Sequence, residues 1–482
     1  MDVLNLEPKE VFRYFKEMSD IPRPSYKEKA ISDYLVAFAK EHNLEYYQDE
    51  LFNVIMIKEA SAGYEDKPAI ILQGHMDMVC ETAPGCTKDM DKEGLNLVVD
   101  GDFLSAEGTT LGADDGIAVA YALALLSDDT LKHPRLEFVC TVSEEVGMDG
   151  AREIDCSMLK GKLLLNMDNE KEGQVLASCA GGGTARIHFP VERESGLADG
   201  EVSVEIALLG GRGGHSGDEI DKGRGNASIL LGRVLRHVNT KVDFKLISIS
   251  GGSKDNAIPR EARAIIAVSK EKVEVVKEKV EASSIAIALE FAKTDAGLNA
   301  TCKEVEASFA PFTKECSDKY MLLLASLPNG IRRMSRDIEG LVETSLNLGI
   351  NHTEEDKVVI GYSVRSSVGT SYMALVEKLK YICEGMGCSV EMYGEYPAWE
   401  FVEKSKFRDN LQKVYKDMFG EELKICAIHA GVECGLLSAK IEGLDAISMG
   451  PNIYDIHTPE ERLSISSAKR SYEFVRKVIE EI

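Results

Sequence analysis

The stretch AIILQGHMDM at residues 69–78 is an apolar run that ends in His75 and Asp77. Its composition predicts a buried strand, and side chains two positions apart at the end of a strand point to the same face. His75 can therefore bind a metal ion while the Asp77 carboxylate fixes its tautomer. A single histidine in such a place is more often a buried core residue, so the prediction depends on other segments.

Other ionisable residues also follow apolar runs. They are Asp114 and Asp115 in TTLGADDG (109–116), Glu144 and Glu145 in RLEFVCTVSEEVG (135–147) and Asp168 in KLLLNMD (162–168). His457, in the polar loop YDIHTPEE (454–461), is a further candidate ligand. Each has a plainer explanation when taken alone, such as a helix N-terminus or a solvated turn. Their shared position after strands favours a common site, because open α/β sheets bind ligands at the carboxyl ends of their strands.

The residue types at this site favour catalytic zinc. Histidines and carboxylates without thiolates are typical of catalytic rather than structural zinc sites. The charges also balance, since Asp114, Glu145, Asp168 and one hydroxide would neutralise two zinc ions. Adjacent residues such as Glu144 and Glu145 tend to face different directions, so one can bind metal while its neighbour contacts a bound water. The sequence therefore predicts a site for two zinc ions.

The pattern of elements predicts an α/β protein with two domains. Residues 8–42 look helical with a break at 21–25, and β-rich runs then alternate with helices, of which Asp115–Leu126 is the clearest. This alternation predicts a mainly parallel sheet flanked by helices. A similar pattern returns near the C-terminus, so we expect a split catalytic domain of residues 1–184 and 396–482.

The intervening residues 185–395 have a different pattern, which predicts an inserted α+β lid domain. GlyGlyGly at 181–183 marks the end of the preceding α/β block. Two segments within it share one order, in which a strand (264–269 and 358–367) is followed by an amphipathic helix (271–292 and 371–386). We interpret this similarity as a weak internal duplication.

Composition and charge exclude several classes of protein. The formal net charge of −25 argues against a nucleic-acid partner, because polyanionic backbones require clustered Lys and Arg. No stretch approaches the ~20 apolar residues that span a bilayer, and MDVLNLEPKEVF lacks a signal-peptide pattern. The 11 Cys are scattered without a C-x-x-C pair, and Cys434 is interpreted as a small buried residue. We therefore expect a cytoplasmic protein without a membrane partner.

The ordered motifs resemble those of the M20 clan of two-zinc metallopeptidases, and in particular the aminoacyl-histidine (Xaa-His) dipeptidases, also called cytosol non-specific dipeptidases or peptidase D. The resemblance extends over nearly the whole chain. It depends on IPRPS, LQGHMDMV, TTLGADDG, SEEVGMDGA, LLLNMD, GGRGGHSG, DNAIPREA, AIHAGVECG and IHTPEERL, which occur in the family's order.

The resemblance implies a role for each residue of the metal site. Asp114 would bridge the ions, His75 and Asp168 would complete one site and Glu145 and His457 the other, Glu144 would be the general base and Asp77 would orient His75. Two zinc ions per chain are implied, with Mn²⁺ or Co²⁺ as substitutes. In the clan the peptide bond after the bridging aspartate is cis, which predicts a cis Asp114–Asp115 bond.

Further residues are implied to contact the substrate. GGRGGHSG lacks the G-K-[ST] of a nucleotide-binding loop. The resemblance instead implies that His215 donates to the oxyanion, and a long, duplicated lid could supply it from the same chain. Arg365 would bind the terminal carboxylate of the substrate, because a guanidinium group can bind it through two hydrogen bonds. Asn256, Gly431 and Glu433 are further candidates for substrate contacts.

The function implied is metal-dependent hydrolysis of dipeptides, Xaa-His and other unblocked dipeptides, by a zinc-bridged hydroxide with Glu144 as the general base. Two alternatives within enzymes stay open: a broader di- or tripeptidase, and a deacylase of N-acyl amino acids. A non-catalytic zinc scaffold is disfavoured, because the base and every ligand are present. Exposed strand edges in the lid would permit a homodimer, and the sequence leaves the oligomeric state open.

Overall fold

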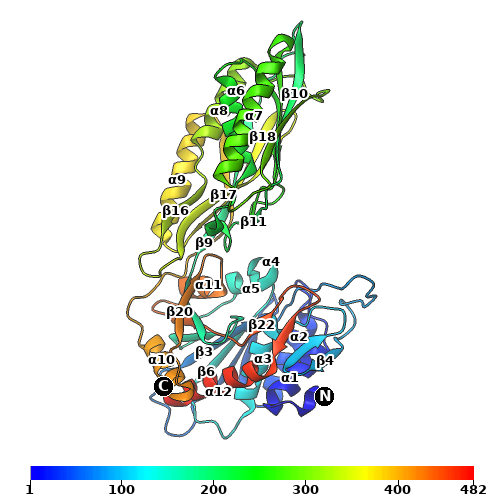
Figure 1. The fold of residues 1–482 in the computed structure, drawn as a ribbon. Coiled ribbons are helices and arrows are strands. Elements are labelled where there is room, and N and C mark those ends of the chain that lie inside the picture. The colour runs from blue at the N-terminus through cyan, green and yellow to red at the C-terminus, as the bar shows by residue number, and fades with distance from the viewer. Residues whose placement is uncertain (1) are drawn as a thin grey trace. The chain divides into compact units, whose positions relative to one another are not determined.

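The computed structural model describes residues 2–482, which form two compact units (Figure 1). The first contains the chain up to Cys179 together with 401–427 and 432–482, and the second contains 180–400 and 428–431. The first boundary lies before the glycine triplet, because Gly181–Pro190 is strand β9 of the second unit. The triplet itself lies in β9, where its first glycine packs closely against Tyr396, Pro397 and Ala398.

The first unit contains most of the ionisable residues singled out from the sequence. Its helices are α1 (Lys9–Ser19), α2 (Lys29–Glu41), α3 (Ala113–Ser127), α4 (Glu144–Gly147), α5 (Asp149–Glu153), α10 (Lys406–Phe419), α11 (Glu433–Lys440) and α12 (Ile465–Glu481). Its strands are β1 (Glu45–Gln48), β2 (Val54–Lys58), β3 (Ile70–His75), β4 (Leu97–Asp100), β5 (Phe103–Ala106), β6 (Leu136–Thr141), β7 (Leu163–Asn166), β8 (Gln174–Cys179), β20 (Lys424–Ile428, which ends in the second unit), β21 (Asp445–Ser448), β22 (Ile453–Tyr454) and β23 (Arg462–Ser464).

The main sheet of the first unit has the order β1-β2-β6-β3-β7-β21-β8-β20. Its central strands β6, β3, β7 and β21 are parallel, whereas the β1–β2, β2–β6 and β21–β8 pairs are antiparallel. The sheet is therefore mixed, and the expectation of a mainly parallel sheet holds for its centre. This centre matters for function, because β3, β6 and β7 end beside one another.

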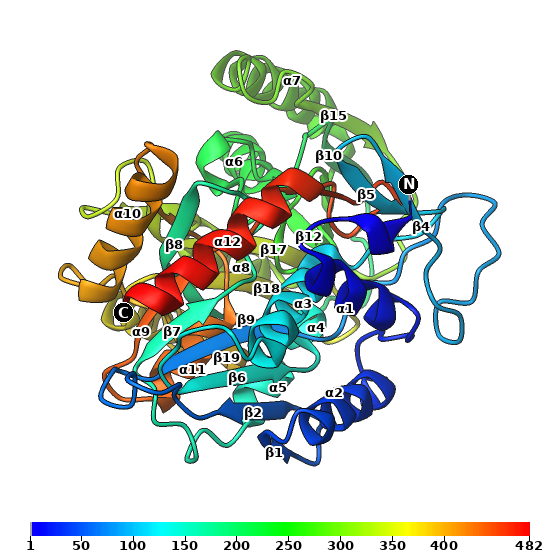
Figure 2. The same cartoon turned by 90° about the horizontal axis from the view of Figure 1, so that it is seen from below.

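Helix α3 is buried along almost its whole length, as its apolar sequence predicts. Figure 2 shows α12 beside it. Tyr121 in α3 donates a hydrogen bond of 2.7 Å to the carbonyl of Ala468 in α12, and its ring packs against Tyr472. Helix α12 is thus packed against the middle of α3.

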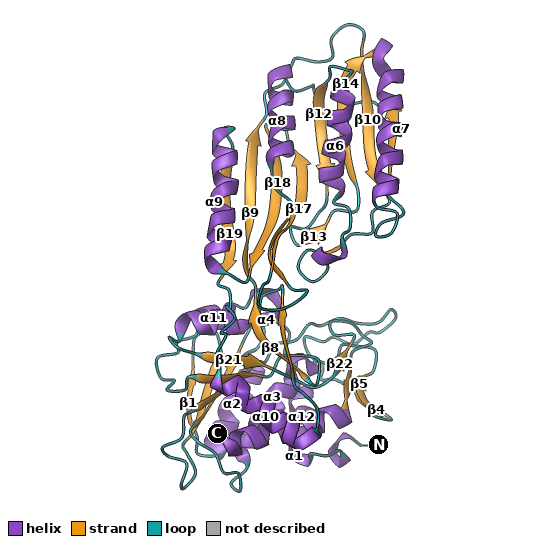
Figure 3. Ribbon diagram, turned by 60° about the vertical axis from the view of Figure 1, so that its left-hand side comes forward, coloured by secondary structure: helices purple, strands orange, loops and turns teal. Residues whose placement is uncertain are grey.

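The second unit is a nine-stranded sheet with helices packed on it (Figure 3). Its helices are α6 (Ala227–Asn239), α7 (Val273–Glu290), α8 (Lys314–Ser326) and α9 (Gly369–Gly385). Its strands are β9 (Gly181–Pro190), β10 (Glu201–Leu209), β11 (Gly214–His215), β12 (Lys245–Gly251), β13 (Ala257–Ile258), β14 (Ala262–Ser269), β15 (Asn299–Glu304), β16 (Gly330–Met334), β17 (Val342–Thr353), β18 (Lys357–Ser366) and β19 (Ser389–Tyr396).

The strand order β15-β10-β14-β12-β17-β18-β9-β19 has two matching halves. In the first half the chain runs β10, α6, β12, β14, α7, β15, and in the second it runs β9, α8, β17, β18, α9, β19. Each half therefore has the same sequence of strands and helices, and the two meet where β12 pairs with β17. The matching order of elements is what an internal duplication would produce. No helix among residues 2–482 is long and apolar enough to cross a membrane.

Candidate metal centre

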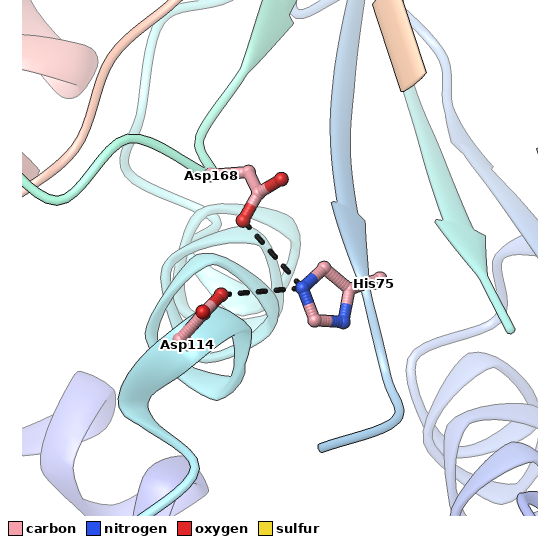
Figure 4. A group of neighbouring side chains, drawn as sticks. All are labelled: His75, Asp114 and Asp168. Atoms are coloured by element: carbon pink, nitrogen blue, oxygen red, sulfur yellow. Dashed lines mark hydrogen bonds and ion pairs between the residues drawn. The ribbon is translucent and has the colours of Figure 1, made fainter. Parts of the chain in front are cut away.

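The first ligand group forms where strands β3 and β7 end side by side. His75 is the last residue of β3, Asp168 follows β7, and Asp114 lies at the start of α3 (Figure 4). His75 Nε2 is 3.3 Å from Asp114 Oδ1 and 3.5 Å from Asp168 Oδ1. The three side chains come from separate segments and point toward one another.

The second ligand group shares Asp114 with the first. His457 Nε2 is 3.1 Å from Asp114 Oδ2 and 3.0 Å from Glu145 Oε2. The ligand atoms of each group of three lie within 4.8 Å of one another. One oxygen of Asp114 thus faces His75 and the other faces His457, which is the geometry of a carboxylate that bridges two cations. The Asp114–Asp115 peptide bond is cis, as the resemblance predicts.

The donor set fits two divalent cations. Ligands at about 2.0–2.1 Å from a tetrahedral zinc ion lie about 3.3 Å apart, which agrees with the distances here. Burial raises the pKa of Asp168 and of Glu144, and nearby carboxylates raise both further. Buried carboxylates that crowd together in this way are normally paired or bind metal ions. Two cations supply the positive charge that this cluster requires.

Glu144 and Glu145 face different directions, as expected for neighbours at the start of α4. Glu145 contacts His457, whereas Glu144 belongs to neither ligand group. The turn that carries them begins at Ser143, which has a left-handed backbone with φ 53°. Ser143 donates from its N–H and its hydroxyl to Glu28 Oε1, at 3.0 and 2.9 Å. A buried carboxylate from the N-terminal segment therefore holds the residue before the predicted base.

Asp77 contacts both His75 and the turn at Glu144. His75 Nδ1 is 3.1 Å from the main-chain carbonyl of Asp77 and 3.4 Å from its Oδ1, so the carbonyl is the closer acceptor. The carboxylate accepts from the N–H groups of Glu144 and Glu145, at 3.0 and 3.3 Å, and from Ser25 Oγ at 2.8 Å. Asp77 thus fixes the position of Glu144 in addition to that of His75.

Glu433 has internal partners in the first unit. Its Oε2 accepts hydrogen bonds from Gln73 Nε2 and, at 2.8 Å, from Thr141 Oγ1. The side chain is fully buried, and burial raises its pKa to about 7. Gln73 Oε1 also accepts from Asn166 Nδ2 at 2.6 Å. The network therefore joins β3, which ends in His75, to β7, which precedes Asp168. One oxygen of Glu433 thus holds the strand ends, whereas its Oε1 is buried without a hydrogen-bond partner among the described residues.

The remaining candidate residues belong to the second unit. His215 and Asn256 lie close together, because β11 pairs with β13 and the Ser216 N–H donates to the Asn256 carbonyl at 2.8 Å. The Asp218 N–H donates to His215 Nδ1 at 3.2 Å. His215 Nδ1 also lies 3.4 Å from Asp218 Oδ2, and this contact and the charge of Arg365 lower the pKa of Asp218. Gly431 lies in the 428–431 segment of the same unit.

Arg365 is nine-tenths buried and only partly satisfied. Its Nη1 donates to Tyr396 Oη at 2.9 Å, whereas its Nε is buried without a hydrogen-bond partner among the described residues. Next to it, Ser345 Oγ and His429 Nε2 lie 2.7 Å apart, and Ser345 pairs with Arg365 across β17 and β18. A guanidinium edge without a partner is suited to bind a carboxylate.

Two buried residues of the first unit were not predicted as site residues. Glu461 accepts hydrogen bonds from the main chain at the start of α3, and Arg23 donates to the carbonyl groups of Met76, Asp77 and Gly112. Both contact segments that carry metal ligands. The sequence holds little to reveal Glu461, because Glu460 beside it is the same residue type and is exposed.

Comparisons with known proteins identify the family of the chain. A profile of peptidase family M20/M25/M40 matches residues 71–481. The cytosol non-specific dipeptidase of Escherichia coli K12 is 35% identical over 481 residues, which are 100% of this chain and 99% of that protein. The structure of aminoacylhistidine dipeptidase from Vibrio alginolyticus is 34% identical with a TM-score of 0.94, over 100% of this chain and 98% of that chain.

More distant structures share the fold. Aminopeptidase PepT from Bacillus cereus is 16% identical, with a TM-score of 0.57 over 99% of both chains. The extent of the family match and the full-length identity to the Escherichia coli protein decide the assignment. The chain belongs to peptidase family M20/M25/M40.

Proposed function

We propose that this protein is a two-zinc dipeptidase that hydrolyses unblocked dipeptides, including Xaa-His. The observation that carries the proposal is the Asp114 carboxylate, whose oxygens face His75 and His457 and belong to both ligand groups. The names of two full-length relatives, cytosol non-specific dipeptidase and aminoacylhistidine dipeptidase, support the substrate class. The first name also supports a cytoplasmic location.

The ligands proposed for the two ions are His75, Asp168 and Asp114 for one, and Glu145, His457 and Asp114 for the other. Bound divalent cations supply Lewis-acid polarisation of a carbonyl oxygen and acidify water. The choice of zinc follows from the donor set of imidazoles and carboxylates, and manganese or cobalt are substitutes that the same donors accept.

Glu144 is proposed as the general base. Its carboxyl group lies beside the ligand cluster without belonging to it, and its main chain is held by the hydrogen bond to Asp77. It would take a proton from the attacking water and deliver that proton to the leaving amine, so that one side chain serves both halves of the reaction. Burial and neighbouring carboxylates raise its pKa, which makes it a stronger proton acceptor.

His215 is proposed as the donor to the oxyanion. When its Nδ1 accepts a hydrogen bond from the Asp218 N–H at 3.2 Å, the neutral imidazole carries its proton on Nε2. That N–H is the donor which a developing negative charge on oxygen requires. The assignment therefore depends on the tautomer that the local backbone selects.

Arg365 is proposed to bind the terminal carboxylate of the substrate. Its buried Nε is without a partner among the described residues, so an incoming carboxylate would satisfy a donor that is otherwise costly to bury. Asn256, one residue from the β13 strand that pairs with His215, is proposed as a neighbouring contact, and Gly431 as a further one.

The test is hydrolysis of matched substrates before and after chelation. The panel contains Gly-His, β-Ala-His, Gly-Leu, Gly-Gly-His, N-acetyl-histidine and Gly-His amide, which lacks the terminal carboxylate. We expect chelator-sensitive cleavage of the free dipeptides and poor cleavage of the amide. Equal cleavage of the tripeptide would make the protein a broader peptidase, and cleavage of the acetylated compound alone would make it a deacylase.

A further inference from the structure

Glu461 binds four consecutive main-chain N–H groups. Its Oε2 accepts from Leu111 and Gly112 at 2.8 and 2.9 Å, and its Oε1 accepts from Ala113 and Asp114 at 2.8 and 3.4 Å. The side chain is 2% exposed. A buried carboxylate that is this fully hydrogen-bonded holds the backbone it contacts in one conformation.

The bound N–H groups are those at the start of helix α3. The first N–H groups of a helix have no partner inside it and are normally capped by a nearby side chain. The residue at the N-cap position is Gly112, which has a left-handed backbone with φ 64° and no side chain to serve as a cap. Asp114 and Asp115 also have non-helical backbone angles. Glu461, 347 residues after Asp114, supplies the missing cap.

Arg23 holds the opposite side of the same turn. Its Nη2 donates to the Gly112 carbonyl at 2.5 Å, and its Nη1 donates to the carbonyls of Met76 and Asp77 at 2.9 and 3.1 Å. Arg23 is 3% exposed, and the negative charge of Glu461 offsets part of the cost of burying its guanidinium group. Together the two side chains connect the segment after His75 to the turn before Asp114.

We propose that Glu461 is a positioning residue for the metal centre, which holds Asp114 where each of its oxygens faces a histidine. Glu461 lies four residues after His457, so the same short segment carries one metal ligand and fixes the backbone of the ligand shared by both groups. A change at Glu461 therefore displaces Asp114 relative to His457 and weakens both ligand groups. This inference rests on the proposed two-metal function.

The test measures zinc affinity of the metal-free protein by competition with a chromophoric chelator, alongside its thermal unfolding. Glu461→Gln keeps the shape of the side chain and places an amide NH2 against N–H groups that need an acceptor. We expect affinity for both ions to fall about 10- to 100-fold, the effect typical of residues that orient ligands. Glu460→Gln removes the same charge from the exposed neighbouring position and is expected to leave affinity unchanged.

A role confined to stability gives a different result. In that case Glu461→Gln lowers the unfolding temperature of the metal-free protein but binds zinc as tightly as wild type, which overturns the proposal. If the Gln variant does not fold, Glu461→Asp keeps the charge with a shorter reach and is expected to weaken zinc binding by at least threefold. Failure of the wild-type protein to bind two ions would instead reject the proposed function.

Discussion

Replacing Asp77 by asparagine tests how the turn that carries the general base is held. The Asp77 carboxylate accepts hydrogen bonds at both oxygens, from the Glu144 N–H at Oδ1 and from the Glu145 N–H and Ser25 Oγ at Oδ2. An asparagine has one acceptor oxygen. Whichever way the amide is turned, its NH2 group replaces an oxygen that accepted from a main-chain N–H. That N–H is then left without an acceptor.

The magnitude follows from those contacts. A hydrogen bond to a charged group contributes about 1.5–3 kcal/mol, and a buried N–H left without an acceptor adds to the loss. Because Asp77 is fully buried, solvent does not replace the missing acceptor. We expect a loss of about 2–3 kcal/mol in transition-state stabilisation, which is about a 30- to 150-fold decrease in kcat/KM.

The assay is steady-state hydrolysis of Gly-His by zinc-loaded protein, with metal content measured in the same samples. Asp155→Asn is the matched control, since Asp155 is an exposed carboxylate of the same unit that also accepts hydrogen bonds from a neighbouring serine. Asp77→Asn with two bound ions and kcat/KM within threefold of the control would refute the claim that this carboxylate positions Glu144.

Three further predictions follow from the other groups. Glu144→Gln retains both metal ions by elemental analysis while kcat falls about 10²- to 10⁴-fold; a variant with more than a tenth of wild-type kcat would show that another group is the base. His215→Asn lowers kcat for Gly-His about 10²- to 10³-fold with little change in KM, and a change confined to KM would exclude the oxyanion role. Burial and the charge of Arg365 lower the pKa of His429 from 6.5 to about 4, so between these pH values the unfolded chain binds more protons than the folded one. The free energy of unfolding therefore falls by up to about 3 kcal/mol as pH falls from 6.5 to 4. Urea unfolding across this range should show a smaller decrease for His429→Asn than for the wild type. The same pH dependence in both proteins would contradict a lowered pKa of His429.

The sequence places most of the candidate metal ligands near one another because they directly follow regular elements. His75 and Asp168 come at or just after apolar runs that form β3 and β7, and these strands are parallel neighbours whose ends must meet. Chain geometry also explains why Glu145 belongs to a candidate ligand group and Glu144 does not, since adjacent side chains diverge. Strand geometry therefore predicts that His75 and Asp168 lie near each other, whereas the place of His457 is implied only by the family resemblance.

The contacts that hold the ligands depend on tertiary structure and could not be predicted in the same way. Glu460 and Glu461 are identical in type and adjacent, yet only Glu461 is buried and caps α3. The preference of His75 for the carbonyl of Asp77 over its carboxylate depends on a difference of 0.3 Å, from 3.1 to 3.4 Å. The antiparallel outer strands of the main sheet likewise follow from how the chain returns to the sheet edge, which periodicity does not encode.

The most direct test of the two-metal site is stepwise addition of zinc to the metal-free protein, with dipeptide hydrolysis measured at each step. Because Asp114 belongs to both ligand groups, the account predicts that activity reaches its plateau at two equivalents of zinc per chain. Full activity at one equivalent, or undiminished activity in the metal-free protein, would contradict it.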